Sequence, residues 1–90
     1  MTFDKFVKLV QECVAKYVNS KLDLTDKKKI TSEDVYLVWY CKTLKNCKAL
    51  ASTPLLDGMY YEITFNGETN EYYLDAYKKW ENRGFAYKEE

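Results

Sequence analysis

The spacing of apolar residues changes once along this chain, from a helical repeat near the start to strand-like patterns after residue 35. In the first segment apolar side chains recur every three or four positions, which places them on one face of a helix. They are Phe3, Phe6, Val7, Val10, Cys13, Val14, Tyr17 and Val18. Thr2 or Asp4 can cap the start of the helix. The sequence therefore predicts an amphipathic N-terminal helix with one buried face.

Residues 35–44, VYLVWYCKTL, are β-branched, aromatic or apolar at nearly every position. Such a run is typical of a central strand that is covered on both faces. Strict alternation places Val35, Leu37, Trp39 and Cys41 on one face, and Tyr36, Val38, Tyr40 and Lys42 on the other. Lys45-Asn46-Cys47 is then the turn into a second strand, Lys48 to Ser52, and Pro54 ends that pairing.

Residues 59–65 and 71–76 read as a hairpin around Asn66-Gly67-Glu68-Thr69. A four-residue loop pairs Ile63 with Tyr72, Tyr61 with Leu74 and Met59 with Ala76, which gives one apolar face. The other face then pairs Thr64 with Glu71, Glu62 with Tyr73 and Tyr60 with Asp75. A two-residue turn would set Glu62 opposite Glu71, and like charges directly opposed are unfavourable. We therefore expect the longer loop.

The last segment continues the strand alternation to about Tyr77, and we expect a short helical or irregular tail after it. The length of 90 residues fits one domain, residues 1–90. The predicted fold class is α+β, with the N-terminal amphipathic helix packed on a small antiparallel sheet of about four strands.

The chain contains no His, which removes the usual proton shuttle near neutral pH and excludes Ser–His and Cys–His nucleophile pairs. Its three glycines form no phosphate-binding loop. Carboxylates such as Glu62 and Asp75 could do acid–base chemistry, but on an open sheet face they are more often surface groups. The sequence therefore favours a binding protein over an enzyme, with no certain cofactor.

Residues 1–22 do not read as a signal peptide, because charged residues interrupt any apolar region. No apolar run approaches the roughly 20 residues that a membrane span needs. Three cysteines without an export signal suggest reduced thiols in a cytoplasm. We therefore expect a cytoplasmic protein that does not associate with membranes.

Cys41 and Cys47 flank the predicted turn at C-x5-C spacing and form a candidate zinc site. Adjacent strands could bring the two thiolates together, and carboxylates or Cys13 would have to complete the ligand set. The alternative is a core thiol at Cys41 and a loop thiol at Cys47.

Charge is divided along the chain: residues 1–50 carry a net +4 and residues 51–90 a net −4. The acidic half places tyrosines among carboxylates on the outer hairpin face, namely Tyr60, Glu62, Glu71, Tyr73 and Asp75. Tyrosines supply large contact areas at low entropic cost, which suits protein recognition, whereas the carboxylates would repel phosphates. These five residues are the candidate partner-binding site. Direct nucleic-acid binding would instead use lysines of the basic half: Lys27, Lys28, Lys29, Lys42, Lys45 and Lys48.

Three segments, VWYCKTLKNCKALAST (38–53), DGMYYEITFNG (57–67) and YLDAYKKWEN (73–82), resemble a family of small phage and prophage proteins. That family occurs in streptococci, lactococci and related Gram-positive bacteria and is classed as of unknown function. The likeness covers nearly the whole chain. In relatives a His can replace Cys47, which keeps the metal site open.

The resemblance implies a protein that acts on host machinery in the host cytoplasm. The class it suggests is an anti-CRISPR inhibitor that binds a type II CRISPR effector nuclease and blocks nucleic-acid loading or cleavage. A nucleic-acid-binding phage accessory protein is the alternative.

Overall fold

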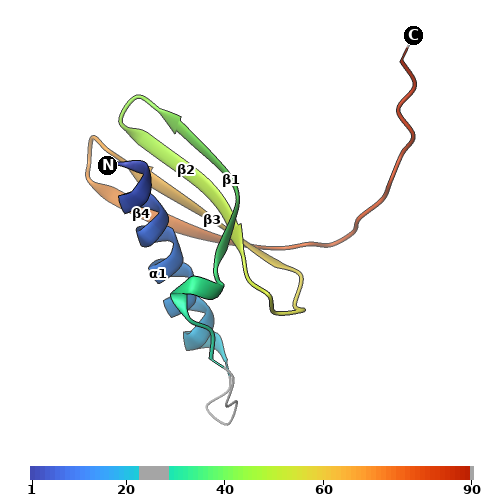
Figure 1. Cartoon of the computed structure of the whole chain (residues 1–90), viewed down its shortest axis with the longest axis horizontal. Coiled ribbons are helices and arrows are strands. Elements are labelled where there is room, and N and C mark those ends of the chain that lie inside the picture. Colours follow the sequence, from blue (N-terminus) through green and yellow to red (C-terminus); the bar gives the residue numbers. More distant parts are fainter. Residues whose placement is uncertain (23–28, 90) are drawn as a thin grey trace.

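The computed structural model describes residues 1–22 and 29–89 and consists of a helix packed on one sheet. The helix α1, Phe3–Lys21, precedes a short 3-10 helix, η1, Ser32–Asp34. Four strands follow, β1, Tyr36–Thr43, β2, Asn46–Ser52, β3, Met59–Asn66, and β4, Glu71–Lys78. Each strand pairs antiparallel with the next, in the order β1-β2-β3-β4, and α1 crosses one face (Figure 1). The predicted α+β fold is therefore confirmed.

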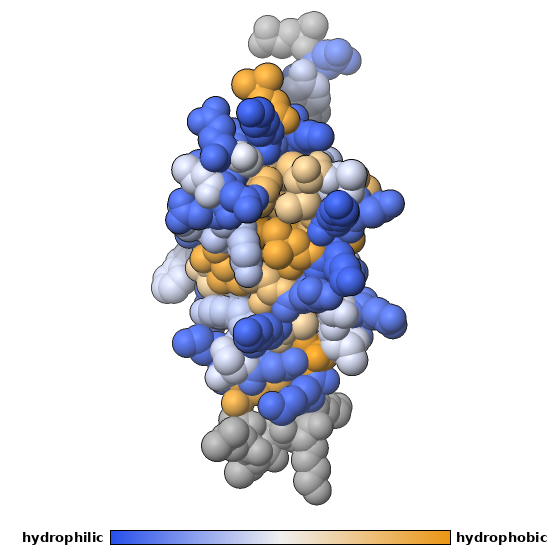
Figure 2. Space-filling view, turned by 90° about the vertical axis from the view of Figure 1, so that its left-hand side faces the viewer, coloured by the Kyte–Doolittle hydropathy of each residue, from blue (hydrophilic) through white to orange (hydrophobic). Residues whose placement is uncertain are grey.

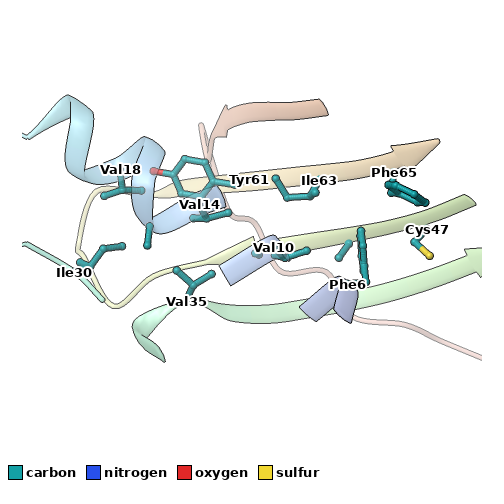
Figure 3. Packing of buried hydrophobic residues seen from close by; sticks show 13 residues of the cluster. Phe6, Val10, Val14, Val18, Ile30, Val35, Cys47, Tyr61, Ile63 and Phe65 are labelled. Carbon is teal, nitrogen blue, oxygen red and sulfur yellow. The ribbon is translucent and has the colours of Figure 1, made fainter. Parts of the chain in front are cut away.

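The helix α1 forms as its apolar spacing predicts. Thr2 caps it, because its side-chain oxygen accepts a hydrogen bond from the Lys5 amide at 3.2 Å. Phe6, Val10, Val14 and Val18 are buried along one side of α1 and pack against the sheet (Figure 3). None of the described helices is both long and apolar enough to cross a membrane.

The connection from α1 to the sheet is attached to the helix by Asn19. The Asn19 side chain donates to the Ile30 carbonyl at 2.8 Å and accepts from the Ile30 amide at 2.9 Å. Both backbone groups of Ile30 are thereby paired, and the Ile30 side chain is buried in the core. Further on, a capping box between Thr31 and Asp34 starts η1.

β1 lies at the edge of the sheet, so the prediction of a central strand covered on both faces is wrong. The cause is that α1 packs over β2 and β3 and leaves most side chains of β1 exposed. The predicted alternation is wrong as well, because a bulge lies between Leu37 and Trp39. Leu37 therefore faces α1, whereas Trp39 faces the open side of the sheet.

The central strand β2 starts two residues earlier than predicted. Leu44, with φ of 56°, and Lys45 make the turn, and β2 begins at Asn46. Cys47, Ala49 and Ala51 are buried beneath α1, and these small side chains let the helix approach the sheet closely. β2 ends at Ser52, two residues before Pro54, as predicted.

The β3–β4 hairpin has the predicted faces but a shifted register. The structure pairs Ile63 with Leu74, Tyr61 with Ala76 and Glu62 with Asp75, two residues away from the predicted partners. The loop has four residues, as predicted, but it spans 67–70 rather than 66–69. The physical reason is that the Asn66 side chain accepts from the amides of Glu68 and Thr69, and Asn70 adopts φ of 59°.

The chain leaves the sheet after Lys78 in an extended tail of residues 79–89. Of the two predicted forms of this segment, helical or irregular, the irregular one is therefore correct. The Lys79 amide donates to the Gly58 carbonyl at 2.7 Å, which fixes the start of the tail. Figure 1 shows the tail running away from the sheet. The radius of gyration is 15.3 Å, compared with about 12 Å for a compact chain of this length.

Gly67 places the two hairpin turns against each other. Its amide donates to the Asn46 side chain at 3.0 Å, and a Cβ at this position would overlap the Lys45 carbonyl oxygen. We expect Gly67→Ala to lower the free energy of unfolding by about 1–3 kcal/mol, because backbone would have to shift. Gly84→Ala is the matched control, since a Cβ there meets nothing within 4 Å. Urea unfolding of both variants tests this, and equal stability would contradict it.

Asn19 holds both backbone groups of Ile30, so its removal leaves two polar groups partly buried without their partner. We expect Asn19→Ala to lower the free energy of unfolding by about 1–3 kcal/mol. Asn82→Ala, in the exposed tail, serves as the control and should change stability by less than about 0.5 kcal/mol. Thermal and urea unfolding should rank the two variants in this order.

Candidate protein-binding face

The side of the sheet opposite α1, here called the open face, holds all five residues of the predicted partner-binding site. The core side chains of β3 are Tyr61, Ile63 and Phe65. Because side chains alternate along a strand, the intervening Tyr60 and Glu62 point to the open face. Through the register of β3 and β4, the predicted residues of β4 share that face: Glu71, Tyr73 and Asp75.

Electrostatics on the open face centre on Glu62. It lies directly across from Asp75 on β4, an arrangement of like charges that is unfavourable by itself. The Lys48 ammonium, on the neighbouring strand β2, lies 3.2 Å from the Glu62 carboxylate and offsets this repulsion. With Glu71, the open face carries three carboxylates on β3 and β4, and the two lysines on the same face are Lys48 on β2 and Lys79 just after β4. Carboxylates therefore outnumber lysines on this face by one.

Several aromatic and apolar side chains of the open face were missed by sequence reasoning. Trp39 joins it because of the bulge in β1, and no local sequence signal indicates that bulge. Leu50 lies opposite Glu62, on β2. Tyr77 lies two and four residues after Asp75 and Tyr73 on β4 and so points to the same face. The alternation of side chains along the strand could have identified it as a residue of the open face. The face is consequently richer in aromatic residues than the five predicted residues suggest.

Two shallow hollows lie on the open face, one on each side of Trp39. The first has a volume of about 470 Å³ and is lined by Trp39, Cys41, Thr43, Lys48 and Thr64 among others. The second has about 430 Å³, and its lining includes Leu50, Tyr60, Tyr77 and Lys79. Both have the volume and the apolar lining with a few polar groups that are typical of binding hollows.

The structure does not bring Cys41 and Cys47 together. Cys47 is buried beside Phe6 and Phe65 (Figure 3), whereas Cys41 is exposed on the open face. The alternative drawn from the sequence, a core thiol at Cys41 and a loop thiol at Cys47, is therefore wrong, because the buried thiol is Cys47. Cys41 lies on the open face because of the bulge in β1. In residues 1–22 and 29–89, no three His, Cys, Asp or Glu residues form a group that could hold a metal ion.

Cys13 and Tyr40 are among the groups on the α1 side of the sheet whose pKa is raised. Burial raises the pKa of the Cys13 thiol, and the positive charge of Lys16 opposes that effect. Removal from water also raises the pKa of Tyr40, as does its hydrogen bond to the Cys47 sulfur at 3.9 Å. Cys13 is half-buried against the core, which is close to its predicted role as a small buried apolar residue.

The lysines proposed for nucleic-acid binding do not share one face. Lys42 lies opposite Cys47 and therefore on the α1 side, whereas Lys48 pairs with Glu62 on the open face. Lys45 is in the turn between β1 and β2, and Lys29 precedes the buried Ile30. Lys27 and Lys28 lie outside the described residues.

The three thiols should differ in reactivity. We expect iodoacetamide to modify the exposed Cys41 first and Cys13 more slowly, because burial and a raised pKa leave less thiolate at Cys13. Cys47 should react only on unfolding. Mass spectrometry of peptides from a time course measures all three. Equal rates for Cys47 and Cys41, or their joint protection by added zinc, would contradict the placement of these thiols on opposite faces.

In a comparison with protein-family models, residues 7–87 match the family of unknown function DUF6275. Neither a curated protein nor a solved structure matches the chain. The matched segment runs from the first turns of α1, through all four strands, to Tyr87 in the tail. The chain therefore belongs to the family of unknown function DUF6275.

Proposed function

We propose that this chain is a binding protein without catalytic activity, and that it uses the open face to block a basic host protein. The observation that carries this proposal is the composition of that face. Trp39, Tyr60, Tyr73 and Tyr77 lie among Glu62, Glu71 and Asp75 on a sheet surface that no described element covers. A few residues contribute most of the binding energy in protein interfaces, and Trp and Tyr are enriched among them. Carboxylates around such residues favour a positively charged partner.

The C-terminal tail extends this binding surface. Trp80, Phe85 and Tyr87 are 94%, 86% and 87% exposed, respectively. Large aromatic side chains gain roughly 1.5–3 kcal/mol each on burial, so a partner that covers the tail would gain affinity from them. The tail starts beside the second hollow, because Lys79 lines it together with Tyr60 and Tyr77. A partner could therefore contact the face and the tail together.

The partner that we propose is a type II CRISPR effector nuclease in the cytoplasm of the host. Nucleases of this class bind nucleic acid in positively charged channels. A negatively charged protein surface suits such a channel and would compete with nucleic acid for it. The resemblance of the chain to small phage and prophage proteins supports the same assignment, because that class includes inhibitors of host defence.

The alternative, a nucleic-acid-binding accessory protein, receives less support from the arrangement of charges. A phosphate-binding surface needs several cations on one side. Lys42 and Lys48 are on opposite faces, and Lys48 is already paired with Glu62.

Tyr73 offers the sharpest test, because it is exposed and lies between Glu71 and Asp75 on β4. The full chain, in excess, should stop DNA cleavage by a type II effector nuclease loaded with guide RNA. Tyr73→Ala should weaken that inhibition about tenfold or more, as expected for an aromatic residue at the centre of an interface. Titrating each variant into a cleavage assay gives the inhibition constants.

Lys8→Ala is the matched control, since Lys8 is an exposed residue of α1, which packs on the other side of the sheet. The Lys8→Ala variant should inhibit as strongly as the unmodified chain. Both variants should unfold at the same midpoint as the unmodified chain. An unchanged cleavage rate at large excess of the chain would reject the nuclease as partner. Equal inhibition by the Tyr73→Ala variant would reject the open face as the site.

A further inference from the structure

β4 forms an edge of the sheet, and within the described part of the chain no strand pairs with its outer side. Along two antiparallel strands, residue pairs that are hydrogen-bonded to each other alternate with pairs that are not. The Lys79 amide donates to the Gly58 carbonyl, so the hydrogen-bonded residues of β4 are the odd-numbered ones. In this register the backbone groups of Tyr72, Leu74 and Ala76 point away from β3. They form a row of donors and acceptors that can bind a further strand.

The two edges of the sheet differ in how well they are protected. β1 contains a bulge between Leu37 and Trp39, and bulges hinder pairing with another strand. β4 pairs with β3 over all eight of its residues, Glu71–Lys78, without a register shift. A regular strand of this kind is the better template for pairing between molecules.

β4 also exposes apolar side chains on the α1 side of the sheet. α1 covers β2 and β3, so the α1-side residues of β4 are only partly covered: Tyr72 is 51% exposed, Leu74 is half-buried and Ala76 is exposed. Tyr72, Leu74 and Ala76 are here called the β4 band. Figure 2, which views the molecule from the side where α1 and the β3–β4 turn lie in Figure 1, shows exposed apolar side chains between charged ones.

We propose that the β4 band binds a second copy of this chain, with the two β4 strands paired antiparallel about a two-fold axis at Leu74. The backbone phase requires even-numbered residues to face each other across the pair, and charge disfavours the two registers next to this one. Axes at Tyr72 or Ala76 would pair fewer residues of β4. Moving the axis to Asp75 would oppose the two Asp75 carboxylates. Moving it to Tyr73 would oppose Glu71 and Asp75, twice. Both arrangements are unfavourable, because residues directly opposite interact most strongly.

With the axis at Leu74, no like charges are opposed within β4. Tyr72 of each copy lies opposite Ala76 of the other, and Tyr73 lies opposite Asp75. The three outward residues of each strand would form about six hydrogen bonds across the axis. The result is a continuous sheet of two copies, with both α1 helices on one side and both open faces on the other. The proposal is independent of the proposed function, because the β4 band and the open face lie on different sides of the sheet.

Sedimentation equilibrium of the full chain should give twice the chain mass of 10.7 kDa at micromolar concentrations. Mild oxidation of the Leu74→Cys variant, with Cys41→Ser to remove the exposed thiol, should then link two copies through a disulfide. Hydrogen-bonded strand partners have Cα atoms about 5.5 Å apart, a distance that a disulfide can span. A monomer at every concentration would overturn the proposal.

Tyr72→Cys in the same Cys41→Ser background is the matched control. Its two copies would lie about 13 Å apart, four residues along the strand, and should not cross-link. Cross-linking of Tyr72→Cys in place of Leu74→Cys would overturn the register. If Leu74→Cys fails to fold, the double variant Tyr72→Cys with Ala76→Cys replaces it. That variant should cross-link, and a double variant that folds without cross-linking would also overturn the proposal.

Discussion

The fold depends on the close contact between α1 and the two central strands. Ala49 and Ala51 on β2 are fully buried and small, so the stripe of Phe6, Val10 and Val14 can reach the sheet. Each large apolar side chain buried there contributes roughly 1.5–3 kcal/mol. A chain of this size has one such core, and a single helix is too narrow to cover four strands. Both the exposed edges of the sheet and its open face therefore result from having a single helix to cover four strands.

This constraint also explains which features the sequence predicts and which it does not. The spacing of α1 and the face of each hairpin residue follow from local periodicity. The helix, the hairpin and the side of the sheet on which its residues lie are therefore predicted correctly. The hairpin register is wrong by two residues, because the Asn66 side chain accepts from the amides of Glu68 and Thr69 and Asn70 takes a left-handed conformation, which moves the loop to residues 67–70. Strict alternation places Trp39 and Cys41 on the same face as Leu37, which is wrong, because no sequence signal near Val38 indicates the bulge.

The molecule thus presents surfaces of different character in different directions. The open face combines aromatic rings with carboxylates, and the tail adds three aromatic side chains beside it. The β4 band, in contrast, is apolar and lies next to unpaired backbone. Charge and aromatic content suit the first surface to a basic partner, whereas strand geometry suits the second to an identical one.

The order of elements along the chain has a consequence for synthesis on the ribosome. α1 emerges first, but the side chains that bury its apolar stripe belong to β2 and β3, which begin at Asn46 and Met59. A nascent chain that ends before β3 exposes Phe6, Val10 and Val14 to water and to other chains. Once β3 is complete, each strand has only to pair with its neighbour in sequence, and such local pairing closes quickly. The nascent chain is therefore most prone to aggregation while the ribosome translates the segment between α1 and the end of β3.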